Sequence, residues 1–142
     1  SPHSFLGIDD EGRTSIVNSK GNKDLHIILR GGKSGPNYSK EHVASCLDMI
    51  EKSGLRKDRA IMVDCSHGNS NKDYTKQSEV FHNVINQYVS GQRRINGIMI
   101  ESNLKPGNQK LSESMEYGQS ITDACISIEE TEKIIEMAYK LL

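Results

Sequence analysis

The segment 61–71, with the sequence IMVDCSHGNSN, constrains the fold of this chain more than any other. It opens with three apolar residues and no turn former, and within four residues it becomes polar and contains glycine. A buried parallel strand changes in this way where it leaves the core and delivers side chains into a site. His67 is therefore the leading candidate for a functional side chain, with a loop cap or a bond to a backbone carbonyl as the structural alternative.

Two other apolar segments end in the same way. A strand at 25–29 ends at Arg30, which two glycines follow, and a strand at 97–100 ends at Glu101. Because amphipathic helices are expected between the strands, the succession predicts a parallel sheet with right-handed crossovers. A long connection, 102–126, follows the third strand, and a loop of that length in a compact domain is usually functional.

Apolar residues at helical spacing locate three helices. The first is capped by Ser39 and ends at Gly54, the second runs from about 72 to 90, and the last begins at Ser127 with Glu130 completing a capping box. The residues expected to face the core are Val43, Leu47 and Ile50 in the first helix, Val84, Ile85, Tyr88 and Val89 in the second, and Ile134, Ile135, Ala138 and Leu141 in the third.

The start of the chain has a different pattern. Two short apolar segments, 4–8 and 14–17, flank the turn-forming sequence Asp-Asp-Glu-Gly. Both arms are short and the turn carries Asp and Gly, so this part of the chain is expected to form a β-hairpin.

Three consecutive strands thus end on Arg30, on the segment 64–67 and on Glu101, and the carboxyl ends of parallel strands lie on one edge of a sheet. An arginine followed by Gly-Gly suits a phosphate or carboxylate, although it could also form a structural ion pair. His67 and Glu101 offer a nitrogen and an oxygen ligand for a divalent cation, although they could simply share a hydrogen bond. Asp123, just before the last helix, could equally be a helix cap.

Composition argues against several classes of function. The formal net charge of −1 at pH 7 gives no electrostatic case for binding nucleic acid or an anionic membrane. No apolar run approaches the roughly 18 residues of a membrane span. Three cysteines at spacings that match no disulfide or zinc pattern indicate a reducing, cytoplasmic compartment. The chain begins at Ser1, which predicts a processed product or a fragment.

The cysteines are expected to be core residues. Cys65 lies two residues before His67, so a continuing strand would place both on one face and make the thiolate available as a ligand. A cysteine in such a place is more often a small buried hydrophobe, and that interpretation is adopted for Cys65, Cys46 and Cys125.

Five motifs together resemble one family. They are LRGGK at 29–33, MVDCSHGNS at 62–70, IESN at 100–103, GNQ at 107–109 and YGQSITDAC at 117–125. In this order they resemble the C-terminal part of type I 3-deoxy-D-arabino-heptulosonate 7-phosphate (DAHP) synthases. The resemblance implies a metal-dependent (β/α)8 TIM barrel, a transferase that condenses phosphoenolpyruvate with erythrose 4-phosphate and releases phosphate. That reaction is the first step of the shikimate pathway of aromatic amino acid biosynthesis.

By this resemblance, Arg30 holds the phosphate of phosphoenolpyruvate. His67, Glu101 and Asp123 are three of the four ligands of a divalent ion, which is Mn, Fe, Co or Zn. His67 also lies close to the substrate, and Asp123 acts as ligand, proton carrier or both. The family takes its fourth ligand, a cysteine, from an early strand that this chain lacks, together with a lysine, a second arginine and the main erythrose-phosphate contacts. Cys65 does not replace that ligand, because relatives tolerate an aromatic residue at its position.

The resemblance also places the hairpin at the site where an aromatic amino acid inhibits the enzyme. Phe5, Gly7 and Val17 would line that site. Gly7 and the sequence of 64–69 favour tyrosine as the inhibitor. A homo-oligomer is implied as well.

Length separates this chain from the whole family fold. A full barrel needs about 250 residues, so 1–22 would be the regulatory hairpin and 23–142 the last three strand–helix units, which need the N-terminal half of the enzyme. Alone, such a piece would have open sheet edges, and we expect it to be inactive. One alternative is a non-catalytic fragment or an assembly or regulatory module. Another is the related synthase that uses arabinose 5-phosphate, against which the hairpin and the sequence of 120–125 argue.

Overall fold

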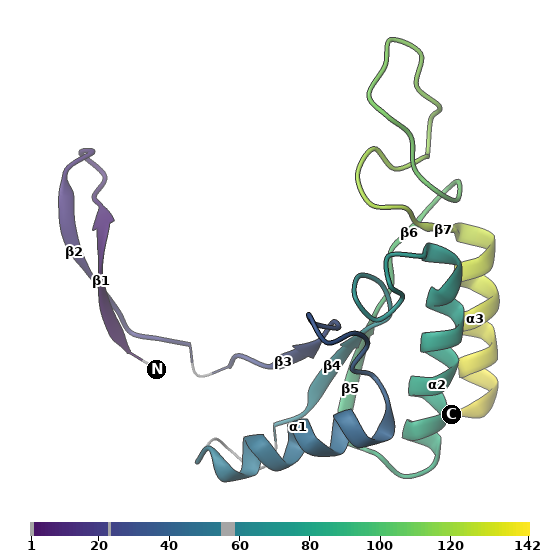
Figure 1. Ribbon diagram of the computed structural model, residues 1–142, viewed down its shortest axis with the longest axis horizontal. Coiled ribbons are helices and arrows are strands. Elements are labelled where there is room, and N and C mark those ends of the chain that lie inside the picture. Colours follow the sequence, from purple (N-terminus) through teal and green to yellow (C-terminus); the bar gives the residue numbers. More distant parts are fainter. Residues whose placement is uncertain (1, 23, 55–58) are drawn as a thin grey trace.

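The computed structural model describes residues 2–22, 24–54 and 59–142. It is a mixed α/β structure, as the sequence predicts (Figure 1). The strands are β1 (His3–Ile8), β2 (Thr14–Ser19), β3 (Ile27–Leu29), β4 (Ile61–Asp64), β5 (Ile95–Met99), β6 (Ser102–Asn103) and β7 (Ile126–Ser127). The helices are α1 (Lys40–Lys52), α2 (Gln77–Val89) and α3 (Ile128–Leu141), with a short 3-10 helix, η1 (Tyr74–Lys76), before α2.

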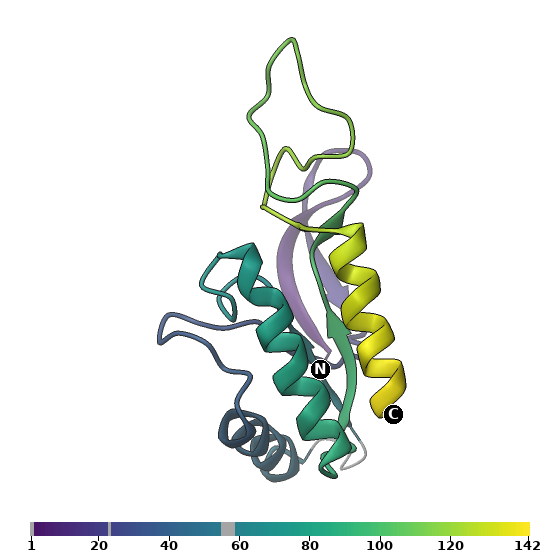
Figure 2. The ribbon, with the colours of Figure 1, turned by 90° about the vertical axis from the view of Figure 1, so that its right-hand side faces the viewer.

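Strands β3, β4 and β5 form a parallel sheet in that order, which confirms the predicted parallel pairing. Alternate residues of a strand point to opposite faces, and one face of this sheet is buried against the helices. Ile61 and Val63 of β4 have no exposed surface, and they belong to a core to which Val43 of α1, Val84 of α2 and Ile134 of α3 also contribute. Figures 1 and 2 show α2 and α3 side by side next to β5.

The other face of the sheet has little cover from the described residues. Ile28 of β3 is 46% exposed, and Met62 of β4, which lies against Gly97 of β5, is only partly buried. An apolar sheet face is stable when another layer packs on it. The helices supply that layer on one side of the sheet.

A side-chain cap marks the start of α1, and left-handed residues delay the start of α2. Ser39 caps α1 as predicted, with its hydroxyl accepting a hydrogen bond from the His42 N–H. Helix α2 begins at Gln77, later than the predicted start near 72. Asn71 and Lys72 have φ angles of 54° and 61°, and such left-handed residues cannot belong to a right-handed helix.

Three residues predicted to face the core are exposed instead: Val89 by 41%, Ile135 by 53% and Leu141 by 46%. Helix α3 buries only a narrow stripe, with Ile134 and Ala138 one turn apart, so the neighbouring positions turn away from the sheet. Val89 is the last residue of α2, and the described residues leave that end of the helix partly uncovered.

The long connection after β5 is more ordered than its composition suggests. Two-residue strands β6 and β7 pair in parallel across its base, an element that the sequence did not indicate. Backbone bonds also close the loop, including Gly107 N–H to the Cys125 carbonyl at 2.8 Å and Gln109 N–H to the Ser120 carbonyl at 2.8 Å. Ser127 caps α3 as predicted, accepting from the Glu130 N–H.

The predicted hairpin is present, with β1 and β2 antiparallel and Phe5 opposite Val17. Its turn is held by the Asp9 carboxylate, which accepts hydrogen bonds from the N–H groups of Glu11 and Arg13. Figure 1 shows the hairpin to one side of the sheet and helices. Among the described residues, none of the helices has the length and apolar character needed to cross a membrane.

Candidate metal and phosphate site

Four residues singled out from the sequence line one cavity. It has a volume of 320 Å³ and is lined by Arg30, Ser66, His67, Lys72, Tyr74, Glu101, Asp123 and Ala124. Arg30 follows β3, Ser66 and His67 follow β4, and Glu101 lies between β5 and β6. Asp123 comes from the segment before β7, which lies beside β6. The structure therefore brings the four residues together at the carboxyl edge of the sheet.

His67, Glu101 and Asp123 each offer a ligand atom within 4.8 Å of the others. His67 Nε2 is 3.5 Å from Glu101 Oε1 and 3.8 Å from Asp123 Oδ2. A separation of 3.5 Å is longer than a good side-chain hydrogen bond, which disfavours a simple His–Glu bond as the reason for the pairing. One imidazole nitrogen and two carboxylates suit a divalent transition metal or zinc, so the donor set fits the ion that the sequence predicted.

Asp64 orients the imidazole toward this cluster. Its side chain is 2% exposed, and Oδ2 lies 2.8 Å from His67 Nδ1, while Oδ1 accepts from the Ser66 N–H at 2.7 Å. A carboxylate accepts hydrogen bonds, so Nδ1 carries the proton and Nε2 presents its lone pair to the cavity. Metal-binding histidines are commonly held by such a carboxylate.

Ser66 is a second supporting residue that the sequence did not single out. Its hydroxyl donates to Glu101 Oε2 at 2.5 Å, and the residue is 4% exposed. This bond occupies one carboxylate oxygen and leaves Oε1 facing His67. One carboxylate oxygen of Glu101, Oε2, is therefore held by a hydrogen bond, and the other, Oε1, is available to bind a metal ion.

Arg30 extends into the same cavity without a strong partner in the sheet. Its Nε is 4.0 Å from Asp64 Oδ2, and its side chain is 58% exposed. A separation of 4.0 Å is too long for a hydrogen bond, and the Asp64 carboxylate is already bonded to His67 Nδ1 and the Ser66 N–H, so the structural alternative for Arg30 has weak support. The guanidinium carries parallel N–H donors, which can bind two oxygens of one phosphate group.

The loop that carries Arg30 is packed backbone to backbone against the loop that carries His67. Gly31 has a φ of +78°, and a Cβ there would lie 2.4 Å from the carbonyl carbon of Gly68. Asn37 Oδ1 accepts from the Gly31 N–H at 2.7 Å. Only glycine fits at this contact, which brings the backbone next to Arg30 close to the backbone next to His67.

Asn69 joins the ends of β3 and β4 and was also missed in the sequence. It is 2% exposed, and its Nδ2 donates to the carbonyls of Leu29 at 3.0 Å and Asp64 at 2.8 Å. Its Oδ1 accepts from the Asn37 N–H at 2.7 Å. An asparagine in a Gly-Asn-Ser segment directly after a strand was the available signal.

The cysteines are buried, as predicted. Cys65 has no exposed surface, and burial, with the nearby Asp64 charge, raises the pKa of its thiol to about 12. A thiol with so high a pKa is protonated at neutral pH when no metal is bound, and Cys65 is not among the residues that line the cavity.

The three hairpin residues share one face. A Cβ built on Gly7 would lie 2.8 Å from Val17 Cγ2 and 3.6 Å from Phe5 Cε2. Phe5 remains 49% exposed, so an aromatic ring is presented beside the gap left by the glycine.

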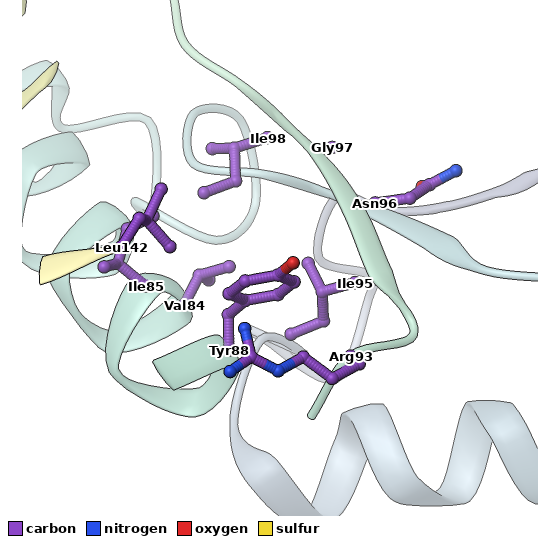
Figure 3. A pocket seen from close by; sticks show the side chains of 9 residues that line it. All are labelled: Val84, Ile85, Tyr88, Arg93, Ile95, Asn96, Gly97, Ile98 and Leu142. Carbon is purple, nitrogen blue, oxygen red and sulfur yellow. The ribbon is translucent and has the colours of Figure 1, made fainter. Parts of the chain in front are cut away.

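A second cavity, of 390 Å³, lies between α2, β5 and Leu142 (Figure 3). Its lining side chains include no acid and no histidine. The guanidinium of Arg93 stacks over the Tyr88 ring at 4.4 Å from the ring centroid, as Figure 3 shows. This cavity lacks the convergent ionisable groups of the first one.

The sequence matches the DAHP synthetase I family over residues 1–136. The chain belongs to this family. The Tyr-sensitive phospho-2-dehydro-3-deoxyheptonate aldolase of Escherichia coli K12 is 50% identical over 137 residues, which cover 94% of this chain and 38% of that protein. The phenylalanine-inhibited aldolase of Saccharomyces cerevisiae is 45% identical over 142 residues, covering 95% of this chain and 38% of that protein.

A solved structure of the same family is similar as well. The phospho-2-dehydro-3-deoxyheptonate aldolase of Francisella tularensis SCHU S4 has a TM-score of 0.87 and 46% identity, over 99% of this chain and 41% of that chain. The resemblance to DAHP synthases is thereby confirmed. The chain spans less than half the length of these relatives.

Proposed function

We propose that this chain is the C-terminal part of a DAHP synthase, which condenses phosphoenolpyruvate with erythrose 4-phosphate. The observation that carries the proposal is the convergence of Arg30, His67, Glu101 and Asp123 on one cavity. Family membership supports it, because relatives over the same residues are named as this aldolase. The rest of the relatives' length would supply the remaining strands of a TIM barrel, and the partly uncovered Ile28 face of the sheet would then point into its interior.

The four residues of the cavity are proposed to have two roles, phosphate binding and metal binding. Arg30 would hold the phosphate of phosphoenolpyruvate by paired N–H donors, and His67, Glu101 and Asp123 would hold a divalent ion. When bound, such an ion supplies Lewis acidity to the aldehyde of erythrose 4-phosphate. The enol carbon of phosphoenolpyruvate would attack the aldehyde carbon, whose oxygen would gain a proton and become a hydroxyl. Water would add to the resulting cation at C2 and lose a proton. The tetrahedral adduct would then break its bond from C2 to the phosphate oxygen, which releases phosphate and leaves a ketone at C2. Asp123, with a side chain 69% exposed, is placed to exchange protons with solvent as well as to ligate.

The aldose phosphate decides between the two related synthases. The protein, with its N-terminal portion, is expected to release phosphate from phosphoenolpyruvate in the presence of erythrose 4-phosphate. Turnover with arabinose 5-phosphate alone would contradict the proposal. A colorimetric phosphate assay with each sugar phosphate, with and without added Mn²⁺, makes the comparison.

Replacing the guanidinium tests the phosphate contact. Arg30→Ala is expected to lower kcat/KM for phosphoenolpyruvate roughly 10- to 150-fold, since a hydrogen bond to a charged group is worth about 1.5–3 kcal/mol. Metal content should stay at the parent level. Lys33→Ala, which removes a charge from the same loop outside the cavity, is the matched control. Parent kinetics combined with lower stability in Arg30→Ala would identify Arg30 as a structural partner of Asp64.

The hairpin is proposed to bind an inhibitory aromatic amino acid, with tyrosine favoured, at Phe5, Gly7 and Val17. Gly7→Ala adds a methyl group 2.8 Å from Val17 Cγ2, and one methyl in an apolar pocket changes binding roughly 10- to 200-fold. We expect the tyrosine concentration needed for half inhibition to rise by that factor. The inhibition of each variant is measured relative to its own activity without tyrosine. Ile16→Val, on the opposite face of the hairpin, should keep the parent sensitivity. Equal sensitivity of both variants would remove Gly7 from the inhibitor site.

A further inference from the structure

Gln77, the first residue of α2, is fully buried, and both the nitrogen and the oxygen of its side-chain amide form hydrogen bonds. Its Nε2 donates to the Glu101 carbonyl at 3.1 Å, and its Oε1 accepts from the Glu101 N–H at 2.8 Å. One primary amide therefore pairs with both backbone groups of one residue, as a neighbouring strand would.

Glu101 lies where the strand ladder is interrupted. Pairing along β5 ends at Met99, whose carbonyl accepts from the Cys65 N–H at 2.8 Å, and resumes at β6. In between, the Glu101 carbonyl accepts hydrogen bonds from both Gln77 Nε2 and the Ile126 N–H, the latter at 3.0 Å. The Glu101 N–H donates to Gln77 Oε1. The side chain of Gln77 thus takes the place of a missing strand residue beside the candidate ligand.

We propose that Gln77 is a positioning residue for the metal centre. By holding the backbone of Glu101, Gln77 fixes how far the Glu101 carboxylate extends toward an ion shared with His67 and Asp123. The hydrogen bond from Ser66 fixes the rotation of that carboxylate. This inference rests on the metal site of the proposed function. It goes beyond that function because Gln77 is not among the residues that line the cavity.

The chemistry at position 77 is narrowly specified. Only an amide carries a donor and an acceptor at the spacing that matches a peptide group. An ionised glutamate would lack an N–H for the Glu101 carbonyl, and methionine would satisfy neither backbone group. Without the amide, the Glu101 carbonyl keeps its bond from the Ile126 N–H, but the Glu101 N–H loses its acceptor. An unpaired backbone N–H is costly, so we expect the backbone at Glu101 to shift and to move the carboxylate with it.

The test measures metal binding directly, in the protein with its N-terminal portion. Gln77→Met keeps the side-chain volume, and we expect it to bind Co²⁺ 10- to 100-fold more weakly than the parent protein. The visible absorption spectrum of bound Co²⁺, which reports ligand geometry, should also change. Phosphoenolpyruvate binding by the metal-free variant, which depends on Arg30, should match the parent.

Val84→Ala is the matched control, because Val84 is buried in the same helix and belongs to the core but does not line the cavity that contains His67, Glu101 and Asp123. It should lower the Tm and keep the parent Co²⁺ affinity. If Gln77→Met does not fold, Gln77→Asn serves in its place. Asparagine keeps the amide, but its side chain is one methylene shorter and cannot reach Glu101, so we expect the same loss of Co²⁺ affinity. Parent affinity and spectrum in a folded Gln77 variant, or an equal loss in Val84→Ala, would overturn the inference. A parent protein that binds no Co²⁺ would instead refute the proposed metal site itself, and the inference with it.

Discussion

Gly31→Ala is expected to destabilise the protein by about 2–6 kcal/mol and to disrupt phosphoenolpyruvate binding. Two costs add at this position. The backbone has a φ of +78°, which a residue with a Cβ rarely adopts, and the new methyl would lie 2.4 Å from a backbone carbon of Gly68. No side-chain rotation relieves a clash with backbone, so the loops that carry Arg30 and His67 must separate.

The neighbouring glycine provides the control for this substitution. A methyl group added at Gly32 would meet nothing within 4 Å apart from its chain neighbours, so Gly32→Ala should change stability by no more than about 0.5 kcal/mol. Urea unfolding of both variants gives the free energies, and phosphoenolpyruvate titration gives the binding constants. Equal stability of the two variants would show that the close contact between the two loops does not hold them in place.

The arrangement of the site was predictable from the ends of strands. Three apolar segments each end in a residue that can bind a charged ligand, and parallel pairing carries Arg30, His67 and Glu101 to one edge regardless of the details of packing. The residue types and their order were sufficient for that inference. Asp123 joins them because β7 pairs with β6, a contact that the sequence did not indicate.

The supporting residues were harder to find. In the sequence, Gln77 is an ordinary polar residue within the predicted second helix and Asn69 is an ordinary loop residue. In the structure, each bonds to backbone far away along the chain. Hydrogen bonds between segments 24 and 40 residues apart leave no periodic pattern. The start of α2 was missed for a related reason, because the left-handed Asn71 and Lys72 are set by the packing of the loop and not by helix propensity.

These 142 residues by themselves are expected to show no synthase activity, although the three proposed ligands, His67, Glu101 and Asp123, would still hold a divalent ion weakly. The second arginine, the lysine and the erythrose-phosphate contacts implied by the resemblance would all come from outside this chain. Positioning two reactants accounts for roughly 7–11 kcal/mol of barrier lowering in favourable cases, and that contribution requires both substrates to be held at once. A site that holds only one substrate gains almost none of this barrier lowering, because the second substrate is not oriented against the first. The chain alone should therefore lose nearly all of the rate.

The measurement is phosphate release from both substrates, first with this chain alone and then with the N-terminal half added. Activity should appear only in the mixture, and His67→Ala in the same mixture should abolish it, which assigns the recovered rate to this cavity. Since typical enzymes turn over at about 10 per second, a comparable rate from the chain alone would show that its own residues bind both substrates. The cavity bounded by Arg30, His67 and Glu101 would then be a complete site, and the barrel interpretation of the uncovered sheet face would be wrong.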